Sequence, residues 1–230
     1  MKILIIKSMN DDRFVNFNRY LSKGVNAAMT LNHKKKDIYA LANKYNISKK
    51  SLAIPEQIHS SNVRWVENPG EYDGVDGLLT SNKCIILSLK VADCVPVYIL
   101  DVQNQIIGLV HAGWRGTVSG IVTKAVKLML KQNSNSNRIK IFLGPSIGQC
   151  CYEVGEEVAE KFQSESKILL MNNKWKVDLK KEISRQLFSL GIKKNNINIS
   201  KYCTYESPSY CSYRRDMYNS GRMFSFLQLM

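Results

Sequence analysis

Four short, almost uninterrupted apolar runs constrain the fold more than any other feature of this chain. They read "CIILSLK" at 84–90, "VPVYILD" at 95–101, "QIIGLVH" at 105–111 and "IKIFLG" at 139–144. Runs of this length and composition predict buried strands. The polar "VQNQ" between the second and third runs predicts a hairpin turn, and Pro96 is expected to interrupt the hydrogen-bond ladder locally. The opening "MKILIIKS" is interpreted as a further, first strand.

Helical patterns alternate with these strands. In "TVSGIVTKAVKLMLK", residues 117–131, apolar side chains recur every three or four positions, which predicts an amphipathic helix. Further helices are expected at about 35–46, at 153–163 and at 178–190, where Asp178 can cap the start and Gly191 can end it. Strands mixed with helices predict an α/β (α+β) fold, with mixed β-sheets flanked by helices. We expect one domain that spans residues 1–230.

Composition and length narrow the class of protein. No apolar run approaches the roughly 18 residues of a membrane span, so no membrane partner is expected. The apolar stretch before Lys7 is too short for a secretory leader, and the six cysteines lack the density of a secreted disulfide scaffold. We therefore expect a cytoplasmic protein with reduced cysteines, most of which serve as small buried hydrophobic residues.

The chain carries a formal net charge of +14, which suits anionic partners. Its lysines are scattered among asparagines, as in "KKNNINISK", without the interleaved aromatic residues of a single-strand binding surface. The charge is therefore interpreted as serving solubility and anionic small molecules, and no specific nucleic-acid partner is expected. A non-catalytic nucleic-acid binder stays open as an alternative, which tight, salt-sensitive binding without enzymatic turnover would support.

Three histidines occur in the chain, and two of them stand where a site can be built. His33 lies in the basic segment "LNHKKK" and is interpreted as a solvated surface residue. His59 lies in a polar loop, Cys94 precedes a predicted strand and His111 ends another, with separations of 35 and 17 residues. Two imidazoles and one thiolate with a fourth position open are typical of a catalytic zinc site. On spacing alone, a buried free cysteine with two ordinary polar histidines is the simpler interpretation.

Longer motifs carry a resemblance to a known family. The segments "QIHSSNV", "KVADCVPV", "HAGWRG", "GPSIGQCCYEVGEEV" and "CTYESPSYCSYRRD" follow one another as in the YfiH-like or YlmD-like laccase-domain family, over about residues 54–222. The resemblance implies a zinc ion held by His59, Cys94 and His111, with copper as the alternative metal. It further implies a purine nucleoside phosphorylase that cleaves adenosine-type nucleosides with phosphate to the free base and ribose 1-phosphate. Adenosine deaminase and methylthioadenosine phosphorylase activities are implied as companions.

Two segments depart from the family pattern. The N-terminal F-x-T-R-x-G-G-V-S element is represented by "NDDRFVNFNRYLSKGVN", in which Arg13 and Arg19 are the candidate substitutes for its arginine. The C-terminal RRD-G-x-T-G-R pattern appears as "RRDMYNSGR", with one more residue between Asp216 and Gly221. The resemblance therefore carries no substrate contact over to these two segments.

Arginines are the expected phosphate ligands, because a guanidinium group matches phosphate oxygens in a bidentate manner. Arg115 precedes a predicted helix, whose N-terminus also favours anions, although hydrogen bonds to loop carbonyls are an equal alternative. Arg215 and Arg222, with Arg214, are further substrate-binding candidates, and Asp216 can pair with one of them.

Three other residues are assigned to substrate chemistry. Asp93, next to Cys94, is the candidate acid/base for deamination, with orientation of a histidine or capping of a turn as the alternative. Gln57 would share a face with His59 in an extended segment and is expected to bind a base or ribose. Trp114 is expected either to stack on a purine or to anchor packing.

Two other enzyme classes stay open. Copper-dependent, laccase-like oxidation of phenols would need several imidazoles for a multicopper centre, which three histidines do not supply. A cysteine hydrolase would use Cys94 as nucleophile and His111 as base, and it would keep its activity after metal removal. Roughly one zinc per chain, in protein made without added copper, is the expected metal content of the His-Cys-His site.

Overall fold

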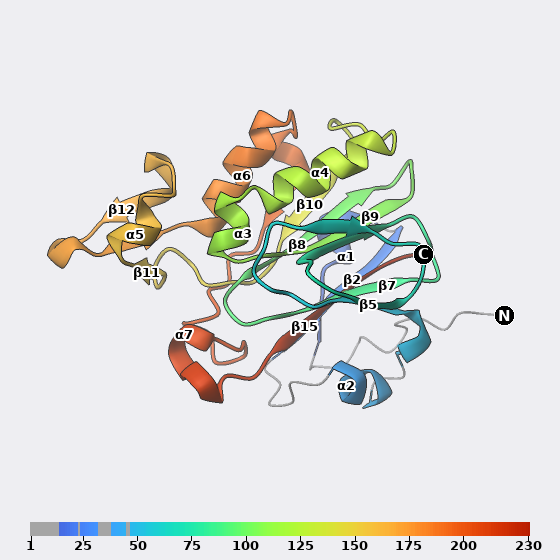
Figure 1. Cartoon of the computed structure of the whole chain (residues 1–230), viewed down its shortest axis with the longest axis horizontal. Helices are drawn as coiled ribbons and strands as arrows, with labels where there is room; N and C mark the ends of the chain where they lie inside the picture. Colours follow the sequence, from blue (N-terminus) through green and yellow to red (C-terminus); the bar gives the residue numbers. More distant parts are fainter. Residues whose placement is uncertain (1–13, 23, 32–37, 45–46) are drawn as a thin grey trace.

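Residues 14–22, 24–31, 38–44 and 47–230 are described by the computed structural model. Within them, two six-stranded mixed sheets pack face to face, and a three-stranded sheet lies at one end (Figure 1). The order of the first sheet is β1 (Phe14–Asn16), β2 (Val25–Thr30), β15 (Met223–Leu229), β7 (Ile86–Val91), β3 (Leu52–Pro55) and β5 (Gly70–Tyr72).

The second sheet positions the candidate site. Its order is β14 (Ile197–Ile199), β10 (Lys140–Leu143), β8 (Val95–Asp101), β9 (Ile106–Ala112), β6 (Gly77–Thr80) and β4 (Val63–Trp65). The small sheet has the order β11 (Glu153–Val154), β13 (Trp175–Val177) and β12 (Lys167–Leu169). Strands β8 and β9 form the predicted antiparallel hairpin, in register from Val95 opposite Ala112 to Asp101 opposite Ile106.

Strand β8 is buried on both of its faces, which explains its uninterrupted apolar sequence. On one face, Val95, Val97 and Ile99 pack with apolar residues of the helices at 121–131 and 179–189. On the other face, Tyr98 and Leu100 pack against the first sheet. The Tyr98 hydroxyl donates to the Ala28 carbonyl at 3.1 Å, which satisfies its one polar atom across the two sheets.

Helices cover the outer faces of the sheet pair. Figure 1 shows α3, α4 and α6 over β8–β10, with α2 at the opposite side of the molecule. The helices are α1 (Asn18–Leu21), α2 (Ile38–Lys44), α3 (Trp114–Val118), α4 (Ile121–Lys131), α5 (Glu156–Ala159), α6 (Leu179–Ser189) and α7 (Tyr213–Asp216). None of the described helices is long and apolar enough to cross a membrane. The predicted fold class, mixed sheets flanked by helices, is confirmed.

The four internal strands predicted from apolar runs are confirmed to within two residues at each end. The helix predicted at 178–190 is α6, and Asp178 caps it by accepting from the Lys181 backbone N–H at 2.9 Å. Gly191 ends it with a φ of 77°. The predicted strand at "MKILIIKS", His33 and Arg13 lie outside the described residues. So do parts of the helix predicted at 35–46, of which α2 is the described portion.

Two helix predictions were wrong in extent. Residues 117–131 do not form one helix, because the chain breaks between α3 and α4 at Gly120, which has a left-handed φ of 73°. The helix predicted at 153–163 is reduced to the four residues of α5, since Glu153–Val154 pairs with β13 instead. Tertiary strand pairing overrides the local helical pattern there.

The predictions for Pro96 and for the cysteines also need correction. Strand β8 runs through Pro96 without interruption, because its pairing with β10 ends at Val97 and Pro96 needs no donor on that side. Most cysteines are not buried: Cys203 and Cys211 are, but Cys84 and Cys150 are exposed and Cys94 and Cys151 are partly buried. No disulfide links the six.

Candidate metal centre and its cavity

Three chain segments bring His59, Cys94 and His111 together. His111 is the last but one residue of β9, Cys94 immediately precedes β8, and the pairing of Pro96 with His111 makes them neighbours. His59 reaches them from the loop after β3. One ligand atom of each lies within 4.8 Å of the other two, and the imidazole rings stand edge to face with centroids 4.9 Å apart. The three residues singled out in the sequence therefore share one location.

A buried carboxylate that the sequence analysis missed organises this cluster. Asp76, immediately before β6, is 0% exposed. Its Oδ1 accepts from His111 Nδ1 at 2.9 Å and from the His59 backbone N–H at 2.9 Å. Its Oδ2 accepts from the backbone N–H and the hydroxyl of Ser60, at 2.7 and 2.8 Å. Because Nδ1 of His111 is engaged, Nε2 is the ring nitrogen left for a ligand.

The two neighbouring imidazoles favour the thiolate form of Cys94. Burial opposes ionisation of the thiol, but His111 and then His59 outweigh it and lower the pKa of Cys94 to about 6. Burial likewise disfavours the imidazolium, but the Cys94 thiolate and the Asp76 carboxylate raise the pKa of His111 to about 9. Each of the two groups therefore favours the charged form of the other.

The donor set fits a catalytic zinc ion. Two imidazole nitrogens and one sulfur are ligands that zinc takes, and the carboxylate that holds His111 is the usual partner of a ligating histidine. Zn–S and Zn–N bonds of about 2.0–2.3 Å require donors roughly 3.5 Å apart, so small side-chain rotations close the observed spacing. The same set also accepts copper.

The cluster opens onto a cavity of about 480 Å³, a size typical of small-molecule sites. Its wall carries the aromatic side chains Trp114, Tyr152 and Tyr213. It also carries three cationic side chains, those of Lys90, Arg214 and Arg222. Flat apolar faces and positive charge around one ligand cluster suit a molecule with an aromatic base and an anion.

Backbone strain gathers at this cavity. Gln57, His59 and Asp93 line it and have φ values of 64°, 61° and 79°. They are three of the seven described non-glycine residues with positive φ. Such conformations cost about 1–3 kcal/mol each and are retained where the surroundings impose them, most often at functional sites.

Gln57 and His59 do not lie in an extended segment, since both have a positive φ. The Gln57 amide donates to the Lys90 carbonyl at 2.7 Å and accepts from the Lys90 N–H at 2.8 Å. Gln57 thus borders the cavity, with its polar atoms committed to the edge of β7.

Asp93 makes the contacts of a turn-capping residue, and its role as an acid/base stays a prediction. Its Oδ1 accepts from the Thr204 hydroxyl at 2.6 Å and its Oδ2 from the Arg214 backbone N–H at 2.7 Å. The carboxylate, 9% exposed, therefore fixes the first turn of α7, which carries Arg214.

The arginines separate into different environments. All five N–H groups of Arg215 donate to the carbonyls of Thr204, Tyr205 and Tyr210 and to Asp216. Its expected substrate contact stays a prediction. Arg222 and Arg214 line the cavity.

Two further arginines lie away from the cavity lining. Arg115 is exposed, lies within α3 rather than before it, and stacks on Trp114 with its Cζ 4.4 Å from the ring centre. It is not among the described residues that line the cavity, and its role as a phosphate ligand stays a prediction. Arg19, offered as a substitute N-terminal arginine, donates to the Tyr20 hydroxyl at 2.7 Å.

Known proteins resemble this chain in sequence and in fold. The chain matches the family described as multi-copper polyphenol oxidoreductase laccase over residues 20–230. The chain belongs to this family. Within it, the chain is 35% identical over 203 residues to adenosine deaminase RL5 of an unknown prokaryotic organism, covering 80% of this chain and 78% of that protein. It is 32% identical over 223 residues to a purine nucleoside phosphorylase of Clostridium acetobutylicum, covering 94% and 92%.

Two solved structures share the fold of this chain. YlmD from Geobacillus stearothermophilus superposes with a TM-score of 0.84 at 27% identity, over 90% of this chain and 92% of that one. YfiH from Bacillus licheniformis gives 0.81 at 26% identity, over 90% and 93%. The resemblance drawn from the sequence motifs is thereby confirmed.

Replacing Asp76 by asparagine should weaken metal binding at His59, Cys94 and His111 by about 10- to 100-fold. The asparagine amide is neutral, so the charge that holds His111 is lost. Its NH₂ group cannot accept the hydrogen bonds that an oxygen of Asp76 accepts. Chelator competition measures the dissociation constant of the bound metal. The metal of this site is recognised because the Cys94→Ser variant no longer binds it. Asp73→Asn, at an exposed position three residues away, is the matched control. Equal affinities for both variants would contradict the role given to Asp76.

Proposed function

We propose that this protein is a metal-dependent purine nucleoside phosphorylase that cleaves adenosine-type nucleosides with phosphate to the free base and ribose 1-phosphate. The observation that carries the proposal is the His-Cys-His cluster at a cavity with aromatic and cationic walls. Relatives named purine nucleoside phosphorylase at 32% identity support the same substrate class.

The metal of this enzyme would be zinc, held by His59, Cys94 and His111. When bound, it supplies Lewis acidity toward a substrate oxygen or water at the open ligand position. Copper fits the same donors, but the chain's three histidines do not supply the ligands of a multicopper oxidase centre. We therefore favour nucleoside chemistry over phenol oxidation.

Binding of phosphate falls to the cationic wall. Among the described hydrogen bonds, Arg222 uses its Nη1 on the Ser220 and Gly221 carbonyls, which orients the guanidinium while its Nε and Nη2 edge stays available to an anion. Arg214 donates through Nη1 to the Glu153 carbonyl and lies over the Tyr152 ring. Asp93 acts as a positioning residue, because it fixes the backbone of Arg214.

The aromatic wall would receive the purine. In phosphorolysis a phosphate oxygen forms a bond to the anomeric carbon while the bond to the purine nitrogen breaks, and the purine leaves more easily when it takes up a proton. Tyr152 keeps its proton at neutral pH, because burial and then the negative charge of Cys94 raise the pKa of its hydroxyl. Its hydroxyl is therefore a donor for a purine nitrogen, and Trp114 offers a stacking face.

Adenosine deamination is the second candidate, favoured by the 35% identity to a protein named adenosine deaminase. Deamination needs a carboxylate or another group that carries protons between water and the departing ammonia. Asp93 is the carboxylate of the described cavity lining, and both of its oxygens already accept hydrogen bonds. Phosphorolysis asks for no such shuttle from Asp93, which is why we rank it first.

Purified protein given adenosine should form adenine and ribose 1-phosphate when phosphate is present, and little product without it. Product identification by chromatography, with and without phosphate, makes the measurement. Cys94→Ser should abolish turnover, whereas Cys84→Ser, at an exposed cysteine, serves as the matched control.

Three outcomes would overturn the phosphorylase proposal. Inosine formed at the same rate with and without phosphate would make the enzyme a deaminase. Activity that survives complete metal removal would favour Cys94 as the nucleophile of a hydrolase, with His111 as its base. Stoichiometric copper together with phenol turnover would favour the oxidase.

Arg222→Gln should lower kcat/KM for phosphate by roughly 10- to 100-fold, mainly through KM, since a charge-assisted hydrogen bond contributes about 1.5–3 kcal/mol. Steady-state kinetics at saturating nucleoside give this value. Arg64→Gln, which removes an exposed guanidinium that stacks on Tyr72, is the control for lost positive charge. Equal phosphate KM values in the two variants would remove Arg222 from the phosphate site.

A further inference from the structure

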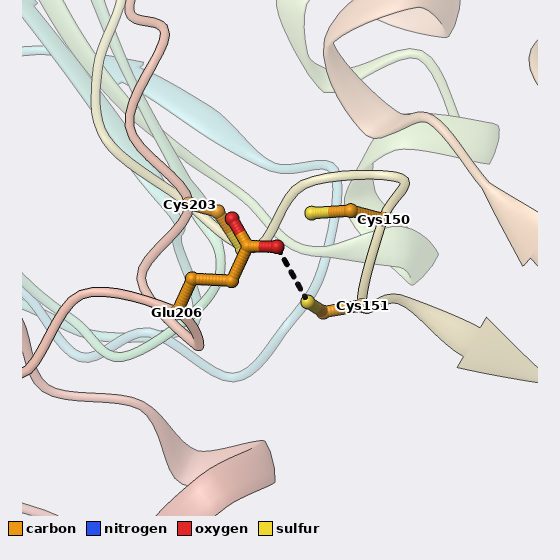
Figure 2. A group of neighbouring side chains, drawn as sticks. All are labelled: Cys150, Cys151, Cys203 and Glu206. Atoms are coloured by element: carbon orange, nitrogen blue, oxygen red, sulfur yellow. Dashed lines mark hydrogen bonds between the residues drawn. The ribbon is translucent and has the colours of Figure 1, made fainter.

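A second group of metal-ligating side chains lies outside the cavity lining of His59, Cys94 and His111. It consists of Cys150, Cys151, Cys203 and Glu206, whose ligand atoms all lie within 4.8 Å of one another. Figure 2 shows these side chains converging, with the Cys151 sulfur 3.7 Å from Glu206 Oε1. The sequence analysis expected most of the six cysteines to be small buried hydrophobic residues, and it assigned no ligand role to these three.

Two loops are fastened together to build this group. The first follows β10 and the second follows β14. Ser146 forms an isolated β-bridge with Cys203, and its carbonyl accepts from the Thr204 N–H at 3.0 Å. The Gly148 N–H points at the Cys203 sulfur at 3.2 Å, a bond that favours a thiolate. The backbone thus holds the sulfurs together independently of any ligand.

Gly148 shows how tightly the sulfurs are gathered. A Cβ at this position would lie 3.0 Å from the Cys150 sulfur and 3.5 Å from the Cys203 sulfur. Glycine therefore leaves room for two thiol groups to face the same point from different loops. A larger residue would push them apart.

The charges around the group suit a cation with anionic ligands. Three sulfur donors and one carboxylate this close form a ligand set whose negative charge, once the thiols ionise on binding, a divalent cation would offset. Lys174, Lys176 and Arg214 line the adjacent cavity together with Cys150 and Cys151, and they would offset the remaining negative charge. Cys150 and Glu206 are exposed, so an ion can enter from solvent.

A disulfide explains the arrangement less well. Adjacent cysteines such as Cys150 and Cys151 bridge only with strain, and a bond from either to Cys203 would leave the third sulfur and Glu206 without a function. Four donors around one point match the four-coordinate S/O sets that zinc accepts. Tetrahedral Zn–S bonds of about 2.3 Å place sulfurs about 3.8 Å apart, within reach of side-chain rotation.

We propose that Cys150, Cys151, Cys203 and Glu206 form a second metal site, which takes a thiophilic divalent cation of the zinc class. On binding, three metal–sulfur bonds and one metal–oxygen bond form, the thiol protons pass to solvent, and no electron is transferred. The site is structural, since all four positions are filled by protein ligands.

A cation at this second site would stiffen the wall of the cavity that contains His59, Cys94 and His111. Tyr152 follows Cys151 directly, and Thr204 follows Cys203 and donates to Asp93 at 2.6 Å. A cation that joins the two loops would therefore hold Tyr152 and Asp93 in fixed positions relative to each other. This site goes beyond the proposed nucleoside chemistry and does not depend on it.

Cobalt titration tests the second site without any activity assay. Reduced, metal-free Cys94→Ser protein, which lacks the sulfur of the first site, should bind Co²⁺ with an intense sulfur-to-cobalt charge-transfer band typical of several thiolates. Adding Cys150→Ser should reduce the band by about a third and weaken cobalt binding at least about 10-fold. Cys150 is exposed, so this change leaves the core intact. Zinc should displace the cobalt.

Two further variants sharpen the test. Glu206→Gln should weaken binding while the band per bound cobalt stays unchanged, because the carboxylate contributes no sulfur. Cys84→Ser in the same Cys94→Ser background should leave both band and affinity unchanged. The proposal fails if Cys94→Ser protein shows no thiolate band, or if Cys150→Ser and Cys84→Ser bind cobalt alike. It also fails if protein purified without reductant lacks two titratable thiols and carries no metal there.

Discussion

The carboxylate of Asp76, closed off from solvent and accepting four hydrogen bonds, is the interaction on which the rest of the site depends. It accepts from the imidazole of one ligand and from the backbone of another, and so determines the distance between them. A buried charge of this kind is tolerated because every acceptor position is used. The left-handed backbone of His59 is part of the same arrangement, since it turns the chain so that two successive N–H groups meet the carboxylate.

The pairing of β8 with β9 is sufficient to place Cys94, the third ligand, beside His111. The β8–β9 hairpin sets Pro96 opposite His111, so the residue that precedes β8 emerges beside the end of β9. At this strand end the Cys94 sulfur faces the imidazoles, and the Asp93 carboxylate fixes α7 across the cavity. One strand start thereby connects the ligand cluster with the cationic wall.

The sequence was most informative where one local cause decides the structure. Fully buried strands such as β8 appear as apolar runs, and a capped helix such as α6 carries its own boundary residues. The ligands His59, Cys94 and His111 could be chosen because motifs resembling a known family contain them. Asp76 was missed because "YDGVDGLL" gives no local sign that its second aspartate will be buried beneath two histidines. The segment around Gln57 is not extended, because its positive φ is invisible in the sequence, and the binding role assigned to Gln57 stays a prediction. The cysteine group was missed because its two loops meet only in the fold.

Zinc K-edge X-ray absorption on a Cys150→Ser/Cys151→Ser/Cys203→Ser variant tests the central claim most directly, since it examines the first site in a protein that lacks all three sulfurs of the second one. The account predicts one sulfur neighbour at about 2.3 Å together with imidazole scattering from two histidines, and the loss of the sulfur in a further Cys94→Ser change. A spectrum with no sulfur neighbour, or one with no imidazole contribution, would contradict it, because His59, Cys94 and His111 would then not share an ion.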